Sequence, residues 1–191
     1  MKWKTPVVRS VVILTIVALS VLIGIIYQAV WNKIDLKNFP RAEHEIVEKY
    51  AETYGVPEYV VYGVMKYESG FASNNVNNDG GVGLMGITED EFDFMLKQTK
   101  ENIHYDALYG PETNIKYGVY MLSQLFARFG NWDAVYAAKT TDMATWESWL
   151  NDKANYDEDG AFLGVPDDEA AARSEKIAEY AKKYRHMYYG E

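Results

Sequence analysis

The stretch PEYVVYGVMKYESGFASNNVNNDGGVGLM (residues 57–85) joins an apolar helical run, a carboxylate and a loop rich in glycine and asparagine. Pro57 suits the first turn of a helix, because the N–H that proline lacks has no partner there. Four apolar side chains follow at helical spacing: Val60, Val61, Val64 and Met65. Residues 72–83 consist mostly of turn-forming residue types. The stretch therefore predicts a buried helix that ends near Glu68, followed by a long loop.

The rest of the chain after residue 40 also has helical periodicity. Thr88, with Glu91 three residues later, has the pattern of a capping box at the start of a helix. Further helices are expected over residues 41–54, from Pro111 to near Gly130, over 132–138 and from Asp167 onward, with an irregular stretch at 151–166. No segment shows the sustained alternation of period two that is typical of a strand. We therefore expect one mainly α domain over residues 41–191.

Composition and charge restrict the classes of function. The chain has 191 residues, no cysteine and a net charge of −9. Residues 1–31 hold three basic side chains and no acid, so the remainder has 16 basic against 28 acidic side chains, a net charge of −12. Such an acidic body is a poor partner for nucleic acid, whose phosphates require a basic face. The missing cysteines exclude disulfides and thiolate metal sites, and a neutral or weakly charged polymer such as a glycan fits better.

The N-terminal segment has the composition of a membrane anchor. Residues 11–31 (VVILTIVALSVLIGIIYQAVW) carry no charge, and about 20 apolar residues cross a bilayer core. The basic residues before this span are Lys2, Lys4 and Arg9, which puts residues 1–10 in the cytoplasm and the body outside. Residues 32–40 are interpreted as a linker. The alternative is a cleaved signal peptide, but its apolar region is usually about 7–15 residues long, and residues 26–30 make a poor cleavage site.

A single carboxylate is the strongest candidate for catalysis. The three histidines are scattered, and neither a nucleophile elbow nor a phosphate-binding glycine loop is present. Glu68 follows an apolar helix and precedes a flexible loop. Burial against apolar walls raises the pKa of a carboxyl, as a general acid for glycosidic cleavage requires. A lone glutamate at a helix end is nevertheless more often solvated, so this feature alone leaves both interpretations open.

The order of several short motifs resembles a known family. The motifs are Tyr67-Glu68-Ser69-Gly70-Phe71, Gly81-Val82-Gly83-Leu84-Met85, Pro111-Glu112-Thr113-Asn114-Ile115, Phe129-Gly130-Asn131-Trp132 and Trp149-Leu150. In this order and spacing they resemble the soluble lytic transglycosylase domain, which is lysozyme-like and related to goose-type lysozyme. The resemblance runs from about residue 42 to residue 184. It implies a mostly helical, lysozyme-like fold with a glycan groove, and it implies that Glu68 is the catalytic acid.

The resemblance also implies a mechanism that needs only one carboxylate and neither cofactor nor metal. Glu68 would protonate the leaving oxygen of a MurNAc-β-1,4-GlcNAc bond in peptidoglycan and then act as base on the 6-hydroxyl of the same sugar, which closes a 1,6-anhydro ring. Asn114 is implied to make a structural bond at the start of its helix. The residues expected to contact substrate or line the groove are Ser69, Gly83, Leu84, Met85, Lys139 and Thr140. Plain core packing is an equally good interpretation for Met85.

Four groove positions depart from the family pattern. The family continues Gly-Leu-Met with Gln, where this chain has Gly86, and its Tyr-Asn pair aligns with Lys139 and Thr140. Arg173 stands where the family has a C-terminal Tyr. The resemblance therefore implies altered polar contacts to the sugars around a retained acid. A positive Lys139 or Arg173 would be suited to the lactyl or peptide carboxylates of the strand.

Three alternatives remain open. A hydrolytic muramidase would need a second carboxylate, for which Asp79 and Glu112 are candidates. A non-catalytic or weakly active peptidoglycan-binding subunit of an envelope secretion or conjugation machine would explain the altered groove. Residues 155–160 resemble the start of a calcium-binding loop, but the twelfth position is Pro166 rather than Glu, which favours an ordinary acidic turn.

Overall fold

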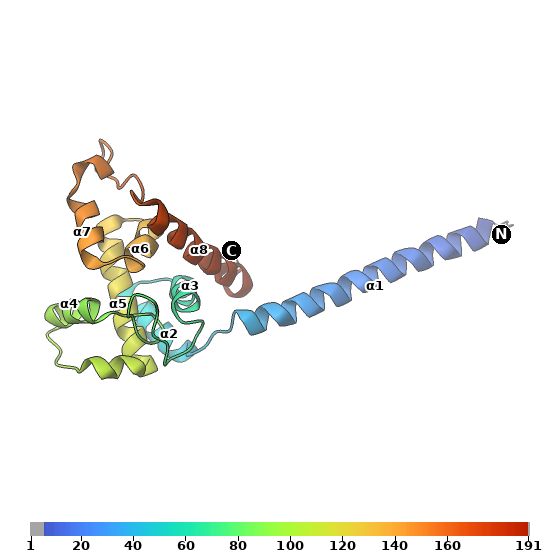
Figure 1. The fold of residues 1–191 in the computed structure, drawn as a ribbon. Coiled ribbons are helices and arrows are strands. Elements are labelled where there is room, and N and C mark those ends of the chain that lie inside the picture. The colour runs from blue at the N-terminus through green and yellow to red at the C-terminus, as the bar shows by residue number, and fades with distance from the viewer. Residues whose placement is uncertain (1–5, 191) are drawn as a thin grey trace. The chain divides into compact units, whose positions relative to one another are not determined.

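The computed structural model describes residues 6–190 and divides the chain between Pro40 and Arg41 into two compact units. Across these residues no β-sheet forms, and strand pairing is limited to isolated bridges. The helices are α1 (Pro6–Asn38), α2 (His44–Tyr54), α3 (Glu58–Glu68), α4 (Glu89–Thr99), α5 (Pro111–Phe129), α6 (Trp132–Lys139), α7 (Met143–Asn151) and α8 (Asp168–Tyr184). Short helical turns are η1 (Tyr105–Tyr109), η2 (Lys153–Asn155) and η3 (Arg185–Tyr189). The expected mainly α class is confirmed (Figure 1).

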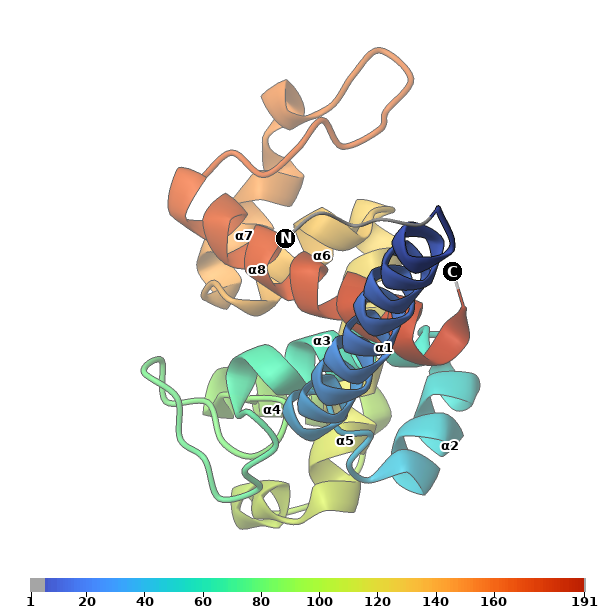
Figure 2. The ribbon, with the colours of Figure 1, turned by 90° about the vertical axis from the view of Figure 1, so that its right-hand side faces the viewer.

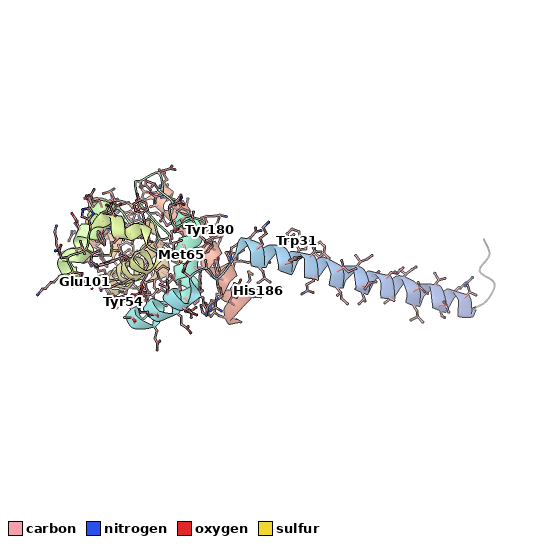
Figure 3. All side chains as sticks on the ribbon, turned by 90° about the horizontal axis from the view of Figure 1, so that it is seen from below. Trp31, Tyr54, Met65, Glu101, Tyr180 and His186 are labelled. Carbon is pink, nitrogen blue, oxygen red and sulfur yellow. The ribbon has the colours of Figure 1, made fainter. Side chains whose placement is uncertain are left out.

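The first unit is a single apolar helix. α1 has 33 residues, a length of roughly 50 Å at 1.5 Å per residue. Its apolar side chains point outward all round the helix, as Figure 3 shows along its length. By length and composition, residues Val8–Asn38 form a candidate membrane span. Of the basic residues expected before the span, Arg9 lies in α1, whereas Lys2 and Lys4 lie outside the described residues. The segment expected as a linker, residues 32–40, is helical as far as Asn38.

The second unit packs around two buried helices, α3 and α5. α5 contacts α2, α4, α6 and η1, and nine of its residues are buried. α8 packs along α3 and α6, so the C-terminal helix lies beside the helix that carries Glu68 (Figure 2). Gly63 allows this contact, because a Cβ there would lie 2.9 Å from the backbone nitrogen of Ala181. The apolar run seen in the sequence, including Val60, Val61, Val64 and Met65, is fully buried.

Within the second unit, the helices agree with the sequence except in two places. α3 starts behind Pro57, α4 has the complete Thr88–Glu91 capping box, and α5 has Pro111 in its first turn. The expected start of the first body helix at residue 41 is wrong by three residues, because Glu43 has a left-handed φ of 54° that a helix cannot continue through. α7 was not expected from the sequence. Asp142 caps it by accepting a hydrogen bond from the Thr145 N–H, and Trp146 and Trp149 are its buried face.

Candidate active site

Glu68 is the last residue of α3, and it carries a buried carboxyl group. Its side chain is only 4% exposed, although helix ends usually face water. α3 reaches this depth because most of its other residues are buried, with α8 and α2 packed against it. The Glu68 carbonyl, which would otherwise have no partner in the helix, accepts a hydrogen bond from Asn75 Nδ2 (2.8 Å). The open interpretation of Glu68 as an ordinary solvated glutamate is therefore wrong.

The asparagine-rich loop folds back over this carboxyl group. Asn77 Nδ2 donates to Glu68 Oε2 over 2.7 Å. Asn77 Oδ1 accepts from the backbone N–H groups of Asp79 and Gly81, at 3.1 and 2.7 Å. One amide thus fixes the loop turn with its oxygen and the carboxylate with its nitrogen. Because residues 72–83 are mostly turn-forming types, the loop can fold back so that the Asn77 amide reaches the end of α3.

The segment after the loop makes a tight turn against Glu68. Val82 and Ile87 exchange two backbone hydrogen bonds (2.9 and 3.0 Å), which closes the four residues 83–86. Gly86 has a left-handed φ of +56°, and a Cβ there would overlap the Glu68 carboxylate. It would also lie 2.9 Å from Asn77 Nδ2. Gly86 therefore brings a backbone segment into direct contact with the carboxyl group, which a side chain at this position would prevent.

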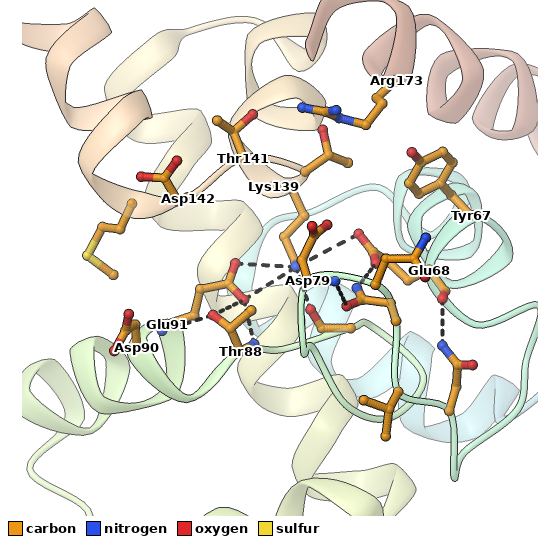
Figure 4. Close-up of a pocket in the computed structure, with 17 residues that line it drawn as sticks. Tyr67, Glu68, Asp79, Thr88, Asp90, Glu91, Lys139, Thr141, Asp142 and Arg173 are labelled. Carbon is orange, nitrogen blue, oxygen red and sulfur yellow. Dashed lines mark hydrogen bonds and ion pairs between the residues drawn. The ribbon is translucent and has the colours of Figure 1, made fainter. Parts of the chain in front are cut away.

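A buried lysine lies between Glu68 and a second glutamate. Lys139 Nζ donates to the Gly86 carbonyl (2.9 Å) and lies 3.3 Å from Glu91 Oε1. Its distance to Glu68 Oε1 is 4.0 Å. Figure 4 shows the Lys139 amino group between the two carboxyl groups, which come from α3 and α4. Glu91 is thus the nearer counter-ion of Lys139, in addition to its bond to the Thr88 N–H in the capping box (2.8 Å).

The electrostatic environment favours a protonated Glu68. Burial raises the pKa of this carboxyl above its ordinary value, while Lys139 and the Asn77 hydrogen bond act in the opposite direction without cancelling it. For Lys139, burial lowers the pKa, but the charges of Glu91 and Glu68 outweigh burial and hold it above its ordinary value. Both directions describe one arrangement, in which a charged Lys139 is paired mainly with Glu91. Glu68 is then left as the group that can exchange a proton.

These groups lie at one side of a pocket of about 740 Å³. The pocket is lined from six regions of the fold, namely the end of α3, the loop over residues 75–79, the turn at Gly86, the start of α4, the residues around the α6–α7 junction, and α8. Figure 4 shows Tyr67, Glu68, Asp79, Thr141, Asp142 and Arg173 around this space. An open cleft with a buried acid on its wall can bind a polymer and protonate an oxygen atom in it.

Lys139 and Thr140, two of the residues expected at the substrate, line the pocket, and both are buried. The Lys139 amino group faces Glu91 and Gly86, so it is not free to bind carboxylates of a glycan strand. The Thr140 hydroxyl donates to the carbonyl of Ala137 within its own helix (3.1 Å). Arg173 also lines the pocket, while its guanidinium donates to Glu169 one turn away (2.7 Å).

The other four residues expected at the substrate, Ser69, Gly83, Leu84 and Met85, do not line the pocket. They lie where the end of α3 meets the Gly-Leu-Met segment. Ser69 Oγ donates to the Leu84 carbonyl over 2.8 Å, which ties the end of α3 to the Gly-Leu-Met segment. Met85 is fully buried against Gly118, where a Cβ would overlap its side chain. A Cβ on Gly83, whose φ is +76°, would overlap the Asn114 amide. Of the two interpretations of Met85, core packing is the one that agrees with the structure.

Asn114 makes buried hydrogen bonds to the segment that contains Gly83, Leu84 and Met85, as the interpretation of Asn114 as a structural residue predicts. It is 1% exposed, and its Oδ1 accepts from the Met85 N–H (2.7 Å). Its Nδ2 donates to the carbonyls of Val82 (2.9 Å) and Leu108 (2.8 Å). One side chain therefore satisfies three buried backbone groups from two segments.

The remaining candidate residues are separated by the structure. Asp79 lines the pocket, whereas Glu112 is bound at the surface by Lys49 (2.8 Å) and Tyr50. In the acidic turn that begins at residue 155, Asp157 Oδ1 accepts hydrogen bonds from the backbone N–H groups of Asp159 and Ala161. Within residues 6–190, no group of three or more histidine or acidic side chains is arranged as metal ligands would be.

Two residues at the carboxyl group were not found from the sequence. Asn77 was visible only as one of several asparagines in a loop, and nothing in the sequence distinguished it. Glu91 was identified as a helix cap, and the cap is present, but its ion pair with Lys139 joins residues 48 positions apart. A buried lysine at the end of an apolar helix was the available signal, since such a lysine requires a carboxylate nearby.

Comparison with known proteins gives a family and a fold. Residues 45–160 match the family model described as the transglycosylase SLT domain. No curated protein sequence matches the chain.

Two solved structures illustrate the fold. The lytic transglycosylase Slt of Pseudomonas aeruginosa, in an inactive mutant form, is 23% identical with a TM-score of 0.64, over 78% of this chain and 24% of that one. The 70-kDa soluble lytic transglycosylase of Escherichia coli is 21% identical with a TM-score of 0.67, over 80% of this chain and 25% of that one. The matched part therefore corresponds to about a quarter of each of these proteins.

Proposed function

Because this chain belongs to the transglycosylase SLT domain family, we propose that it is a membrane-anchored lytic transglycosylase that cleaves peptidoglycan with Glu68 as its acid and base. One observation carries the proposal. Glu68 is a buried carboxyl group with a raised pKa, and it lies on the wall of an open pocket about 740 Å³ in volume. A raised pKa keeps a carboxyl protonated closer to neutral pH, where it can donate a proton to a leaving group.

In the proposed reaction the proton of Glu68 leaves and returns. Glu68 donates it to the oxygen that links C1 of MurNAc to C4 of GlcNAc, and the C1–O bond breaks. The carboxylate then accepts the proton of the MurNAc 6-hydroxyl, whose oxygen bonds to C1 and closes a 1,6-anhydro ring. No water is consumed, and Glu68 ends protonated as it began. The nucleophile is intramolecular, so proximity replaces the second carboxylate that most glycosidases use.

The hydrolytic alternative now has one candidate residue. Asp79 lines the same pocket as Glu68, and its charge raises the pKa of that carboxyl. A muramidase would use such a carboxylate to activate water. Asp79 is exposed on the loop. Its hydrogen bond to Asn77 Oδ1 uses the Asp79 backbone N–H, so this bond does not hold the Asp79 carboxylate in one position. We therefore favour the single-carboxylate mechanism and treat hydrolysis as an outcome of the test.

The proposed location follows from α1 and from the substrate. The uncharged residues 11–31 span roughly 31 Å as a helix, which matches a bilayer core. We propose that residues 1–10 are cytoplasmic and that residues 41–191 act outside the membrane on glycan strands. A weakly active or non-catalytic subunit of an envelope machine would have the same placement.

The test is to digest purified peptidoglycan with the full chain in detergent and to measure the mass of the products. Fragments one water lighter than hydrolysis products are expected. The Glu68→Gln variant should be slower by about 10²–10⁴-fold or more, because it cannot transfer the proton. Products of full hydrolytic mass would favour the muramidase. Glycan binding without cleavage by the unmodified chain would favour a non-catalytic binding subunit.

A further inference from the structure

Three buried ionisable side chains meet at the wall of the pocket, and they come from three different helices. The exposed fractions of their side chains are 4% for Glu68, 2% for Lys139 and 8% for Glu91. A buried ammonium group requires a counter-ion, because desolvation of an isolated charge costs far more than a hydrogen bond returns. Lys139 Nζ is closer to Glu91 (3.3 Å) than to Glu68 (4.0 Å). Glu91 is therefore the nearer counter-ion of the lysine, and Glu68 lies within reach of the same positive charge.

We propose that Lys139 and Glu91 form a charge-setting pair for Glu68, in which the lysine stabilises the carboxylate left after proton donation and Glu91 limits that stabilisation. This inference rests on the proposed function, in which Glu68 is both acid and base. Glu68 must be protonated to donate a proton and deprotonated to accept one, so its proton affinity must be intermediate. Two opposite charges at unequal distances provide such an intermediate value, and neither residue need touch the sugar.

The pair also fixes the backbone against which Glu68 rests. Lys139 Nζ donates to the Gly86 carbonyl (2.9 Å), and Gly86 is the residue whose missing Cβ leaves room for the carboxylate. Lys139 and Gly86 are both departures from the family pattern, which has Tyr and Gln at these positions. The structure shows that these departures touch each other although they are 53 positions apart. They are therefore parts of one altered arrangement around the acid, in which Lys139 is a positioning residue.

The charges around Glu68 act with opposite signs. Burial is the largest influence and raises its pKa, Lys139 lowers it, and Glu91 and Asp79 raise it. The titratable or charged groups that face this carboxyl or line its pocket are Lys139 from α6, Glu91 and Asp90 from α4, Asp79 from the loop, Asp142 before α7, Tyr67 beside it on α3 and Arg173 from α8. Removal of Lys139 and removal of Glu91 should consequently move the proton affinity of Glu68 in opposite directions. A merely structural role for the pair gives no such sign reversal.

The experiment is an NMR titration of side-chain carboxyl carbons in the full chain in detergent micelles. The Glu68 signal is identified by its absence in Glu68→Gln. Lys139→Met is expected to raise the titration midpoint of Glu68 and Glu91→Gln to lower it. In the double variant Lys139→Met/Glu91→Gln the midpoint should lie above that of the unmodified chain, because the lysine has the larger effect. If Lys139→Met does not fold, Glu91→Gln and the double variant still carry the test.

A matched control removes a lysine from an exposed ion pair. Lys49→Met deletes the same charge at the Lys49–Glu112 pair on the surface, and the Glu68 midpoint should not move. The inference is overturned if the Lys139 and Glu91 variants leave the midpoint unchanged or move it in the same direction. The alkaline limb of the pH–rate profile should follow the midpoint, because Glu68 must be protonated to start the reaction.

The two readouts separate failure of the inference from failure of the proposed function. Opposite midpoint shifts in a chain that does not cleave peptidoglycan would support the charge-setting pair and contradict the proposed enzyme. Cleavage of peptidoglycan with an unchanged Glu68 midpoint in the variants would contradict the charge-setting pair and support the proposed enzymatic function.

Discussion

The buried carboxyl of Glu68 makes a prediction about stability as well as activity. Burial raises its pKa above the value in the unfolded chain, so the folded state binds this proton more tightly. The contribution of Glu68 to the free energy of unfolding is then highest below the pKa of the unfolded state. It falls as the pH rises through the pKa of the folded state. We expect Glu68→Gln to have a higher melting temperature than the unmodified chain at neutral pH. The difference should shrink as the pH is lowered.

Glu112→Gln is the matched control for thermal unfolding across the same pH range. Glu112 is exposed, and hydrogen bonds from Lys49 and Tyr50 lower its pKa. Its contribution to stability is therefore present above the unfolded pKa and lost as pH falls through the folded pKa. No gain in melting temperature is expected at neutral pH. A Glu68→Gln chain that is less stable at neutral pH and not at acidic pH would contradict burial as the main influence on Glu68.

Gly86 tests how closely the backbone must approach the acid. Gly86→Ala should lose about 1–2 kcal/mol of stability from its left-handed φ. It should also lose activity by about 10²-fold, because the Cβ displaces the Glu68 carboxylate. Gly55→Ala is the control for peptidoglycan cleavage per enzyme, since its φ is +68° with no atom within 4 Å of the added Cβ. Equal activity in the two variants would show that the Gly86 contact is irrelevant to catalysis.

At the scale of single residues, the sequence indicated Glu68 as the proposed acid but not the residues that surround it. Glu68 was predicted because an apolar helix leads directly to it and a motif contains it. Asn77 and Glu91 could not be predicted as its neighbours, because long-range contacts decide which loop amide and which cap side chain meet the carboxyl. Ser69 and Met85 belong to the same motifs as the predicted site. Ser69 connects the backbone segments of the site, and Met85 is buried in the core. The motifs alone therefore did not show which of their residues line the pocket and which hold the surrounding backbone in place.

Between elements, Asn114 is the connection that keeps the site segments together. Asn114→Ala leaves the Met85 N–H and the Leu108 carbonyl buried without this partner, whereas the Val82 carbonyl keeps its hydrogen bond from the Ile87 N–H. Each such group costs about 1–3 kcal/mol, so we expect the free energy of unfolding in urea to fall by at least about 2 kcal/mol. The exposed Asn151→Ala, which loses one bond to Glu147, should change it by less than about 0.5 kcal/mol. Similar values for the two variants would contradict the structural role of Asn114.

Helices with a local start signal could be predicted, and those set by tertiary contacts could not. Pro57, Thr88 and Pro111 each mark a helix start through their own backbone or side chain. The start of α2 was missed because Glu43 adopts a left-handed conformation that its residue type does not indicate. α7 had a usable signal, the Asp142 cap before Trp146 and Trp149. Its short length and a lack of clear periodicity concealed it.

For the whole molecule, the proposed topology predicts which part is accessible. Protease added to intact spheroplasts should digest residues 41–191, because α1 would hold them outside the membrane. A cytoplasmic protein in the same cells serves as the control and should be cut only after permeabilisation. A protected body would contradict the topology, and a mature N-terminus found after residue 25 would show that the segment is a cleaved signal.

The central claim is that Glu68 cleaves glycan strands without water as nucleophile. Digestion of purified peptidoglycan by the full chain in water enriched with ¹⁸O tests it most directly, because hydrolysis places a solvent oxygen on the new sugar end and ring closure by the 6-hydroxyl does not. The account predicts 1,6-anhydro products without ¹⁸O, and none of these products from the Glu68→Gln variant. Products that carry ¹⁸O at the new end, or unchanged cleavage by Glu68→Gln, would contradict it.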